Sequence, residues 1–304
     1  MNARPVRVGT RASALALAQT GLVVERLAAL GLEVETVTIR TSGDRAQSDG
    51  SMMLERGAFV KDLEAALRAG EVDLAVHSAK DMPTDIPKET VLAAFPMRGD
   101  ARDALVTRDG SRLVDLPAGS RVGTESPRRR AFIGLERPDV VVAPIRGNVD
   151  TRLAKLDAGE VDALVVAAAG LERLGLSDRI AEALPVARMI PAPGQGALAV
   201  QARAGDPWAE RAAEIDDWGT RMEVTAERAF LRAMGGGCRA PFAAHASWFQ
   251  GELAMDAAAL SPAGTGILRE RLVARDEEAG ALGERLARRL LDRGAERLAD
   301  GGGA

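Results

Sequence analysis

The sequence contains very little cysteine and histidine. Its one cysteine, Cys238, cannot form an intramolecular disulfide, so a disulfide framework is excluded. Its two histidines, His77 and His245, lie far apart and lack the spacing of metal ligands. A zinc site of histidine and cysteine is therefore not expected, and we predict no metal.

Long apolar runs and an excess of positive charge are also missing. The N-terminus MNARPVRVGTRAS has no apolar run of signal-peptide length, and no stretch could cross a bilayer. A cytoplasmic protein without a membrane partner is therefore expected. The net charge of −4 argues against general nucleic-acid binding, which usually needs a basic protein. With 46% hydrophobic and 28% charged residues, the chain has the composition of a globular protein.

The first part of the chain alternates between strand and helix patterns. VRVG is a short strand, and the helix after it has Ser13 as a favourable N-cap and Gly31 as a stop. EVETVTIRT alternates like a strand, GAFVKDLEAALRAG has one apolar helical face, and residues 72–76 read as a buried strand. This order is typical of an α/β unit.

A near-repeat indicates a second lobe of the same plan. LRAGEVDLAVHSA recurs in outline as LDAGEVDALVVAA, at an offset of 158 − 69 = 89 residues. We predict two similar α/β lobes with a ligand cleft between them, because α/β sheets bind ligands beyond the carboxyl ends of their strands. His77, Ser78 and Asp81 are replaced by valine, alanine and glycine in the second copy. The fold therefore does not need their polarity.

Shifts in composition predict the domain boundaries. The chain crosses to the second lobe near MRGDARDALVTRDG and returns in the Pro- and Gly-rich RMIPAPGQGALAVQAR. Residues 1–98 with 194–217 would form lobe 1, residues 99–193 lobe 2, and residues 218–304 a small α+β domain. In this last part, Thr220 and Glu223 have the spacing of a capping box at a helix start.

The buried strand in EVDLAVHSAKDMPT ends in unusual polarity. Lys80 and Asp81 follow it directly, at the strand end where α/β proteins bind ligands. Asp81 could act as a general acid or stabilise a developing cation, and Lys80 could bind substrate anions. The alternative is that Asp81 only caps the turn before Pro83. His77 is expected to support this loop through hydrogen bonds.

Arginines recur in loops and at helix starts. Arg11 lies just before the first helix, where free N–H groups favour an anion, and TESPRRR and IRGNVDTR add more. Guanidinium groups bind carboxylates and phosphates bidentately, so a ligand with several such groups is predicted. The alternative is that these arginines only solubilise the surface.

Cys238 lies among glycines in GGGCRAP, and this setting lets other atoms approach its sulfur. We predict a nucleophile or a covalent attachment point. The alternative is an unreactive thiol, and no histidine lies close in sequence to form the usual Cys–His pair.

These segments together resemble porphobilinogen deaminase, also called hydroxymethylbilane synthase, a family of tetrapyrrole biosynthesis. The matching motifs run in family order over nearly the whole chain: VRVGTRASALALAQ, FVKDLEAAL, VHSAKDMPT, VGTESPRRR, IRGNVDTRLAKLD, PAPGQGALAVQAR and GGGCRAPFAAHA. The resemblance implies two α/β lobes like those of periplasmic binding proteins, followed by a small α+β domain that carries a cysteine.

The resemblance also implies a chemistry. Cys238 would carry a dipyrromethane cofactor through a thioether, and Asp81 would be the catalytic aspartate during the stepwise addition of four porphobilinogen units. Cofactor contacts would come from Lys80, Ser126, Arg128, Arg129, Arg146 and Gly147. Substrate contacts would come from Arg11, Ser13, Arg56, Phe59, Thr124, Arg152, Gln195 and Gly196.

The resemblance also implies binding partners, and the sequence departs from the usual family pattern at two positions. The ligands would be porphobilinogen and the growing polypyrrole chain, with hand-over of the product to uroporphyrinogen-III synthase and a monomeric state. Arg56 stands where the family often has lysine. Glu125 replaces a common serine, so it should point away from the site or change the local binding pattern.

Two other functions would explain part of these features. A two-lobed anion-binding module without catalysis explains the lobes and arginines, but not a cysteine domain, and it predicts a secretory signal or a DNA-binding helix pair. A cysteine hydrolase would need a base near Cys238 that the sequence does not show.

Overall fold

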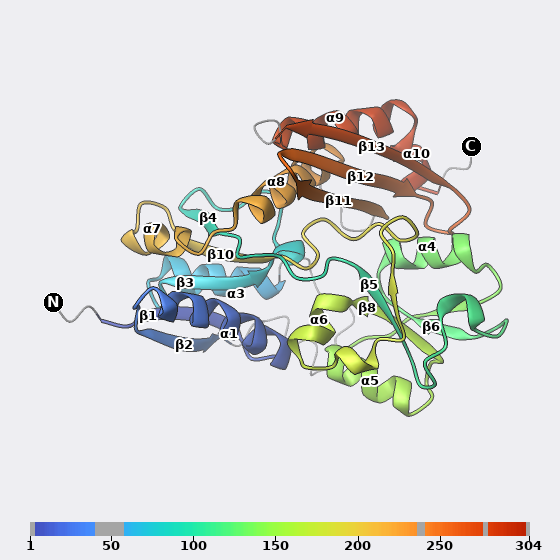
Figure 1. Cartoon of the computed structure of the whole chain (residues 1–304), viewed down its shortest axis with the longest axis horizontal. Helices are drawn as coiled ribbons and strands as arrows, with labels where there is room; N and C mark the ends of the chain where they lie inside the picture. Colours follow the sequence, from blue (N-terminus) through green and yellow to red (C-terminus); the bar gives the residue numbers. More distant parts are fainter. Residues whose placement is uncertain (1–3, 40–57, 236–240, 276–278, 302–304) are drawn as a thin grey trace. The chain divides into compact units, whose positions relative to one another are not determined.

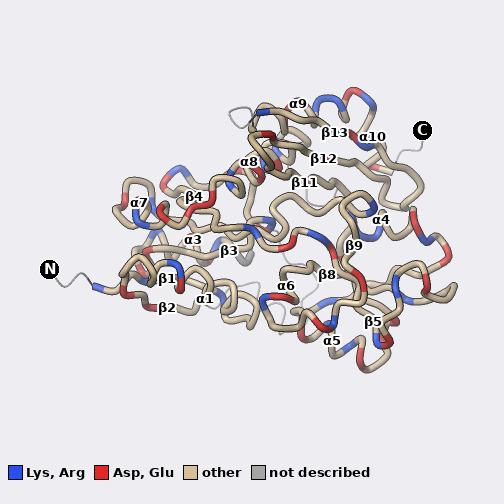
Figure 2. The backbone as a smooth tube through the Cα atoms, viewed as in Figure 1, with Lys and Arg blue, Asp and Glu red and all other residues tan. Residues whose placement is uncertain are grey.

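The computed structural model describes residues 4–39, 58–235, 241–275 and 279–301. The chain divides into two compact units, Met1–Arg98 with Ala197–Arg221, and Gly99–Gly196 with Met222–Ala304. Figure 1 shows both as mixtures of sheet and helix. Acidic and basic residues are interspersed along the described chain (Figure 2).

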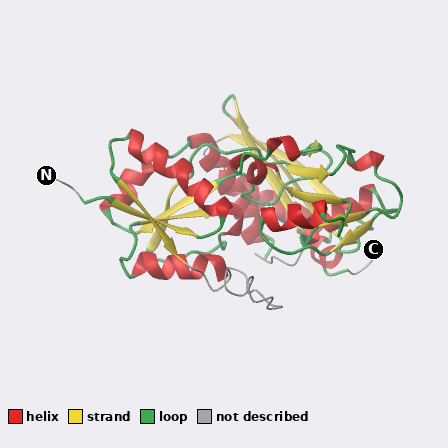
Figure 3. Cartoon of the chain, turned by 90° about the horizontal axis from the view of Figure 1, so that it is seen from below, coloured by secondary structure: helices red, strands yellow, loops and turns green. Residues whose placement is uncertain are grey.

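Lobe 1, in the first unit, is a five-stranded sheet in the order β2-β1-β3-β10-β4. Its strands are β1 (Val6–Arg11), β2 (Val34–Ile39), β3 (Leu74–Ser78), β4 (Thr90–Ala94) and β10 (Leu198–Arg203). β1 runs parallel to β2 and β3, whereas β10 is antiparallel to both of its neighbours. The helices are α1 (Ala14–Ala29), α3 (Ala58–Arg68) and α7 (Pro207–Ala213), and Figure 3 shows helices on both faces of this sheet.

Two apolar layers bury the two faces of the lobe 1 sheet. Val8, Leu74 and Val76 belong to the layer that also contains residues of α1 and α7. Ala75 belongs to the layer formed with Leu63 and Leu67 of α3. The predicted helix end at Gly31 is confirmed, since this glycine has φ +79°, a conformation that glycine adopts without strain.

Lobe 2, in the second unit, repeats this topology with the order β7-β6-β8-β5-β9. Its elements are β5 (Asp103–Thr107), β6 (Arg121–Gly123), β7 (Val141–Ala143), β8 (Ala163–Ala167), β9 (Glu182–Leu184), α4 (Pro127–Glu136), α5 (Val149–Asp157) and α6 (Ala168–Arg173). Short 3-10 turns cover Leu113–Asp115 (η2) and Ser177–Arg179 (η3).

The register shows that the lobes correspond residue by residue. RVGT occurs at 7–10 in β1 and at 121–124 in and after β6. The N–H of Asp73 donates to the carbonyl of Arg7, and the N–H of Asp162 donates to that of Arg121, both at 2.8 Å. β3 and β8 therefore superpose in register at the offset of 89 found in the sequence, so the predicted pair of similar α/β lobes is confirmed.

The C-terminal part of the second unit has its own sheet and core. Antiparallel strands β11 (Phe242–Phe249), β12 (Glu252–Leu260) and β13 (Ile267–Arg275) pack with α8 (Trp218–Ala233), α9 (Ala279–Asp292) and α10 (Ala295–Ala299). The predicted α+β character of this part is confirmed. Its separation as a third domain, with the boundaries given above, stays a prediction.

The predicted capping box of α8 is wrong. The side chain of Asp217, not Thr220, accepts the N–H at the helix start, with 2.8 Å between Asp217 Oδ1 and Thr220 N. Aspartate is as good an N-cap as threonine or better, so it takes this place one turn earlier than the sequence pattern suggested.

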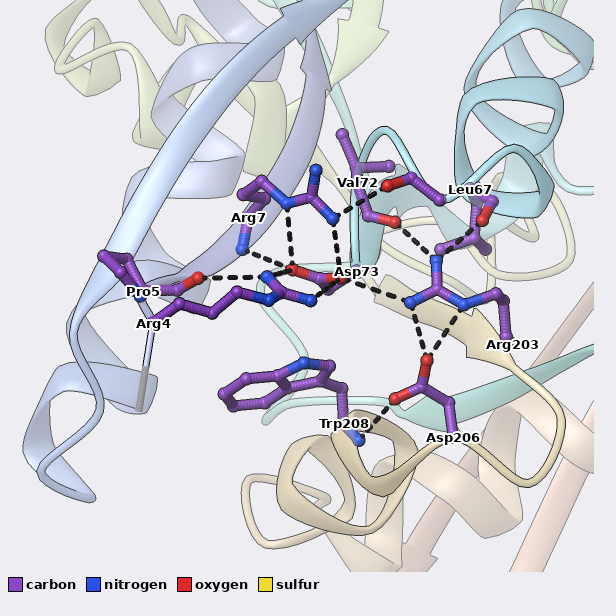
Figure 4. Close-up of polar contacts among 10 residues, drawn as sticks. Arg4, Pro5, Arg7, Leu67, Val72, Asp73, Arg203, Asp206 and Trp208 are labelled. Atoms are coloured by element: carbon purple, nitrogen blue, oxygen red, sulfur yellow. Dashed lines mark hydrogen bonds and ion pairs between the residues drawn. The ribbon is translucent and has the colours of Figure 1, made fainter. Parts of the chain in front are cut away.

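A buried carboxylate fastens the start of the lobe 1 strands (Figure 4). Asp73 accepts bonds from Arg4 at 2.6 Å, from the backbone and side chain of Arg7, and from Arg203 at 3.2 Å. Its own side chain is fully buried. Burial opposes ionisation, but the arginine hydrogen bonds outweigh it and hold the pKa of Asp73 well below its usual value.

Asp73→Ala is expected to lower the free energy of unfolding by about 3 kcal/mol, because it removes the shared partner of three arginines. The matched control is Asp162→Ala at the equivalent position of lobe 2, where the carboxylate is 43% exposed and pairs with Arg108. That change should cost about 1 kcal/mol or less. Urea unfolding measures both, and equal losses would contradict the assignment.

Candidate active site

The predicted polar end of β3 forms a short turn at the carboxyl edge of the lobe 1 sheet. Lys80 and Asp81 lie in the 3-10 turn η1 (Ala79–Asp81). The N–H of Ala79 donates to the carbonyl of Ala197 at 3.0 Å, and Gln19 of α1 donates to Ser78 Oγ at 2.9 Å. The turn is therefore held by both β10 and α1.

Asp81 is exposed on this turn. Within the described part of the chain, no hydrogen bond or ion pair engages its carboxylate, and the turn closes instead through the N–H of Met82 and the carbonyl of Ala79. A capping residue would accept a nearby backbone N–H. The interpretation of Asp81 as only a turn cap is therefore not supported, and its charge is directed to solvent.

Arg11 and Ser13 lie beside this turn, where β1 leads into α1. Ser13 is the N-cap, as predicted, and its side chain accepts the N–H of Ala16 at 3.3 Å. Arg11 ends β1, and its charge contributes to lowering the pKa of His77 on the neighbouring strand. The structure thus brings Arg11, Ser13, Lys80 and Asp81 to the same edge of lobe 1.

His77 is buried in β3 and is bonded to the neighbouring strand β10, so its expected support of the loop after β3 stays a prediction. Its Nε2 lies 3.1 Å from Gln201 Oε1 on β10. Burial is the main cause that lowers the pKa of His77 to about 4, against an ordinary value of 6.5. The ring is therefore neutral at physiological pH.

The low pKa of His77 predicts a pH dependence of stability. As pH falls from 6.5 towards 4, the unfolded chain binds a proton at this histidine before the folded protein does. The contribution of the neutral ring to stability is therefore complete above about pH 6.5 and is lost as pH falls towards 4. The total loss of stability over this range is on the order of 3 kcal/mol. Urea unfolding from pH 7 to 4 should fall less steeply in His77→Val. Parallel curves would contradict this prediction.

In lobe 2 the equivalent helix start presents Thr124 and Ser126. Ser126 caps α4 and accepts the N–H of Arg129 at 3.4 Å, and Thr124 Oγ1 accepts the N–H of Ser126 at 3.2 Å. Thr124 is buried. The helix start of α4 corresponds to that of α1, so each lobe directs one helix N-terminus to the carboxyl edge of its sheet.

Arg128 and Arg129 share a buried carboxylate that the sequence did not reveal. Arg128 Nη1 lies 2.7 Å from Asp103 Oδ2, and Arg129 Nη2 lies 2.8 Å from Asp103 Oδ1. All three side chains are at most 8% exposed. Burial disfavours the charge of Asp103, but the two arginines outweigh it and hold its pKa well below the ordinary range.

This cluster keeps one positive charge in excess, since two guanidinium groups face one carboxylate. Arg128 Nε is buried without a hydrogen-bond partner among the residues that the structure describes. Burial lowers the pKa of Arg129, and Asp103 only partly offsets this. A buried donor without a partner is costly, so the cluster fits an anionic ligand.

Gln195 and Gly196 join this cluster to the segment that returns to lobe 1. Gln195 Nε2 donates to Asp103 Oδ1 at 2.9 Å, and Arg129 Nη2 donates to Gln195 Oε1 at 3.3 Å. Gly196 has φ +84°, and a Cβ there would lie 2.7 Å from the carbonyl oxygen of Gly99. Only glycine fits this close approach.

Arg173 is a further member that sequence reasoning missed. Its Nη2 donates to the carbonyl of Gly196 at 2.5 Å, and burial lowers its pKa. It lies in α6, where the sequence pattern is typical of an arginine on the exposed face of a helix. The only available signal was its place after β8, where lobe 1 carries η1.

Arg146, Gly147 and Arg152 lie around the start of α5. Arg152 Nε donates to the carbonyl of Gly147 at 2.8 Å. Burial lowers the pKa of Arg152, and the nearby charge of Arg129 lowers it further. Arg146 is 62% exposed, and its Nε lies 3.4 Å from Glu125 Oε1, so Glu125 forms an ion pair with one of the arginines predicted to bind the cofactor.

Three of the predicted site residues lie in or next to segments outside the described residues. Arg56 and Cys238 lie outside the described residues, and Phe59 is placed on the first turn of α3. Among the described residues, no cluster of histidine, cysteine or carboxylates could hold a metal ion. Likewise, no described helix is long and apolar enough for a membrane span.

Family models match almost the whole chain. Residues 6–211 match the "Porphobilinogen deaminase, dipyromethane cofactor binding domain", and residues 221–292 match the "Porphobilinogen deaminase, C-terminal domain". The boundary between these matches lies at the start of α8.

Curated relatives agree over nearly full length. The chain is 49% identical over 96% of its length to the porphobilinogen deaminase of Acidothermus cellulolyticus, covering 90% of that protein. It is 45% identical to that of Syntrophotalea carbinolica, with 98% of the chain and 96% of that protein covered. It is 46% identical to that of Thermus thermophilus, with 97% and 98% covered.

Solved structures match part of the chain. A periplasmic substrate-binding protein of an ABC transporter from Coxiella burnetii matches 69% of this chain and 91% of its own, at 17% identity and a TM-score of 0.41. A nutrient-binding protein from Burkholderia cenocepacia bound to methionine matches 69% and 90%, at 16% identity and a TM-score of 0.42. These likenesses concern the fold alone.

Proposed function

Because the chain belongs to the porphobilinogen deaminase family, we propose that it is a hydroxymethylbilane synthase, a transferase that condenses four porphobilinogen molecules head to tail. Each addition breaks the bond between the aminomethyl carbon and its nitrogen, releases ammonia and forms a carbon–carbon bond between pyrroles. Asp81 carries this proposal, because its exposed carboxylate lies at the carboxyl end of β3 with no described partner.

The dipyrromethane cofactor of this family fits the residues that are present. A group with several carboxylates suits the excess charge around Asp103 and the unpartnered Arg128 Nε. When bound, it supplies the free pyrrole carbon to which the first porphobilinogen is joined. Cys238 would hold it through a thioether, and further contacts would come from Lys80, Ser126, Arg128, Arg129, Arg146 and Gly147.

Asp81 would act on the reacting porphobilinogen. Loss of ammonia leaves a positive charge on the pyrrole, and a fixed carboxylate next to the ring nitrogen lowers the energy of that cation. The same carboxylate can accept a proton while the new bond forms. The substrate's acetate and propionate would be bound by Arg11, Ser13, Arg56, Phe59, Thr124, Arg152, Gln195 and Gly196.

Incubation of the purified protein with porphobilinogen tests this function. We expect one ammonia for each porphobilinogen consumed, together with a linear tetrapyrrole as the product. Binding of porphobilinogen without ammonia release would instead favour a two-lobed binding module without catalysis.

The finer biological setting stays a prediction. A monomeric enzyme in the cytoplasm that passes its product to uroporphyrinogen-III synthase is expected from the family. Sedimentation of the purified protein would test the monomer.

A further inference from the structure

Four polar side chains form a buried hydrogen-bond network under α3 in lobe 1. Gln201 Nε2 donates to Glu64 Oε1 at 3.0 Å and to Thr90 Oγ1 at 2.8 Å. Gln201 Oε1 lies 3.1 Å from His77 Nε2. Each of the four residues is at most 7% exposed. The network links α3, β3, β4 and β10.

Lobe 2 builds the same positions from aliphatic residues. Gln201 pairs with Ala75, whereas Val106 pairs with Leu164, which corresponds to Ala75 at the offset of 89. The same offset places Leu153 where lobe 1 has Glu64 and Val166 where it has His77. Leu153, Val106 and Val166 are buried together in one apolar core.

The aliphatic residues of lobe 2 show that this fold does not depend on polar side chains at these positions. Apolar residues of similar volume often replace buried charged networks with no loss of stability, or with a gain. Lobe 2 shows that this topology accepts them here. The polar network is therefore not needed for the fold. Lobe 1 differs from lobe 2 in carrying Lys80 and Asp81 directly after β3.

The donor and the acceptor of each of these hydrogen bonds can be assigned. Thr90 donates its one hydroxyl hydrogen to the carbonyl of Pro87 at 3.0 Å, so its oxygen can only accept from Gln201 Nε2, and Glu64 Oε1 lies against the same nitrogen. Both therefore receive hydrogens from the Gln201 amide, whose oxygen is left to face His77. His77 must then donate from Nε2, so its tautomer is fixed and its Nδ1 has no hydrogen.

We propose that Glu64, Gln201 and His77 are positioning residues that hold the end of β3, and with it the Asp81 carboxylate, in the productive geometry. Glu64 orients the Gln201 amide, and this amide fixes the ring of His77, four residues before Asp81. Burial keeps that ring neutral beside Arg11, so it adds no competing charge at this edge. The inference rests on the proposed catalytic role of Asp81.

The tautomer of His77 gives a test that does not depend on activity. The chain has only two histidines, so long-range proton–nitrogen spectra of the labelled protein contain two imidazole rings, and His245→Gln assigns them. We expect His77 as the Nε2–H tautomer, and a mixture of tautomers in Glu64→Leu and Gln201→Val. A wild-type Nδ1–H ring, or the same tautomer in both variants, would overturn the relay.

Kinetics of variants made from the residues of lobe 2 test the positioning role. Glu64→Leu/His77→Val/Gln201→Val should keep or raise the unfolding midpoint and carry cofactor by intact mass. Its kcat should fall at least about tenfold with little change in KM, because small misplacements of a catalytic group have effects of this size or larger. A purely structural network predicts a lower midpoint and an unchanged kcat for each loaded molecule, and this result would sink the proposal.

Two further variants sharpen the comparison. Glu64→Gln keeps an acceptor for the Gln201 amide and should restore most of the kcat that Glu64→Leu loses. Thr20→Val removes the buried bond to Thr10, 2.7 Å long, on the α1 side of the sheet, and should lower the midpoint without lowering kcat. If Asp81→Asn retained turnover, the proposed catalytic role of Asp81 would fail while the tautomer result stood.

Discussion

Cys238→Ala is expected to abolish turnover, with a loss of at least about a thousandfold in the rate of tetrapyrrole formation. A thiolate is a strong nucleophile, and alanine offers no atom to which a pyrrole methylene could bond. In the attachment, the bond between the methylene carbon and Sγ forms, ammonia leaves and the thiol proton is lost. Without the covalent anchor, the growing chain has no fixed start.

Intact mass and activity of the same preparation check this expectation. Cys238→Ala should have the mass of its sequence alone, bind porphobilinogen weakly and release no product. Its unfolding midpoint should fall, because a bound cofactor stabilises the folded state. A folded circular dichroism spectrum at the assay temperature separates lost chemistry from lost folding. Full activity in this variant would place the attachment elsewhere or remove the need for it.

Asp81→Asn is expected to lower kcat by about 10²–10³-fold, the usual effect of removing one group that stabilises charge in a transition state. Asparagine has nearly the same shape, but it neither carries the negative charge nor accepts a proton as a carboxylate does. KM for porphobilinogen should change little, because the arginines and helix starts still bind the substrate carboxylates.

The matched control for Asp81→Asn is Asp115→Asn. This makes the same chemical change at an exposed carboxylate that pairs with Arg112, outside the candidate site. Steady-state kinetics of both variants should show a loss only at Asp81. Near-normal turnover in Asp81→Asn would mean that this residue only shapes the turn before Pro83.

Local patterns were sufficient for the elements that frame the site. The buried strand, predicted at 72–76 and found at Leu74–Ser78, the N-cap at Ser13 and the polar turn with Asp81 each depend on residues close together in the chain. The two-lobe fold followed from a repeat whose register the structure confirms at Asp73 and Asp162. Local reasoning failed at α8, where two N-cap candidates lie three residues apart and Asp217 is the one used.

The missing parts of the site depend on contacts between distant segments. Asp103 pairs with Arg128 and Arg129 only because β5 lies beside β8, under α4. Gln201 bonds Glu64 across 137 residues, and neither side chain has a polar neighbour in sequence that signals the bond. A single sequence shows the charges of such residues, but not which carboxylate lies between which arginines.

The intact mass of the purified wild-type protein tests the central claim most directly, because it separates a deaminase carrying its own cofactor from a two-lobed binding protein. We predict a mass above that of the sequence by two linked pyrrole units, located by peptide mapping on the fragment that contains Cys238. An active protein with the unmodified mass of its sequence would contradict the account.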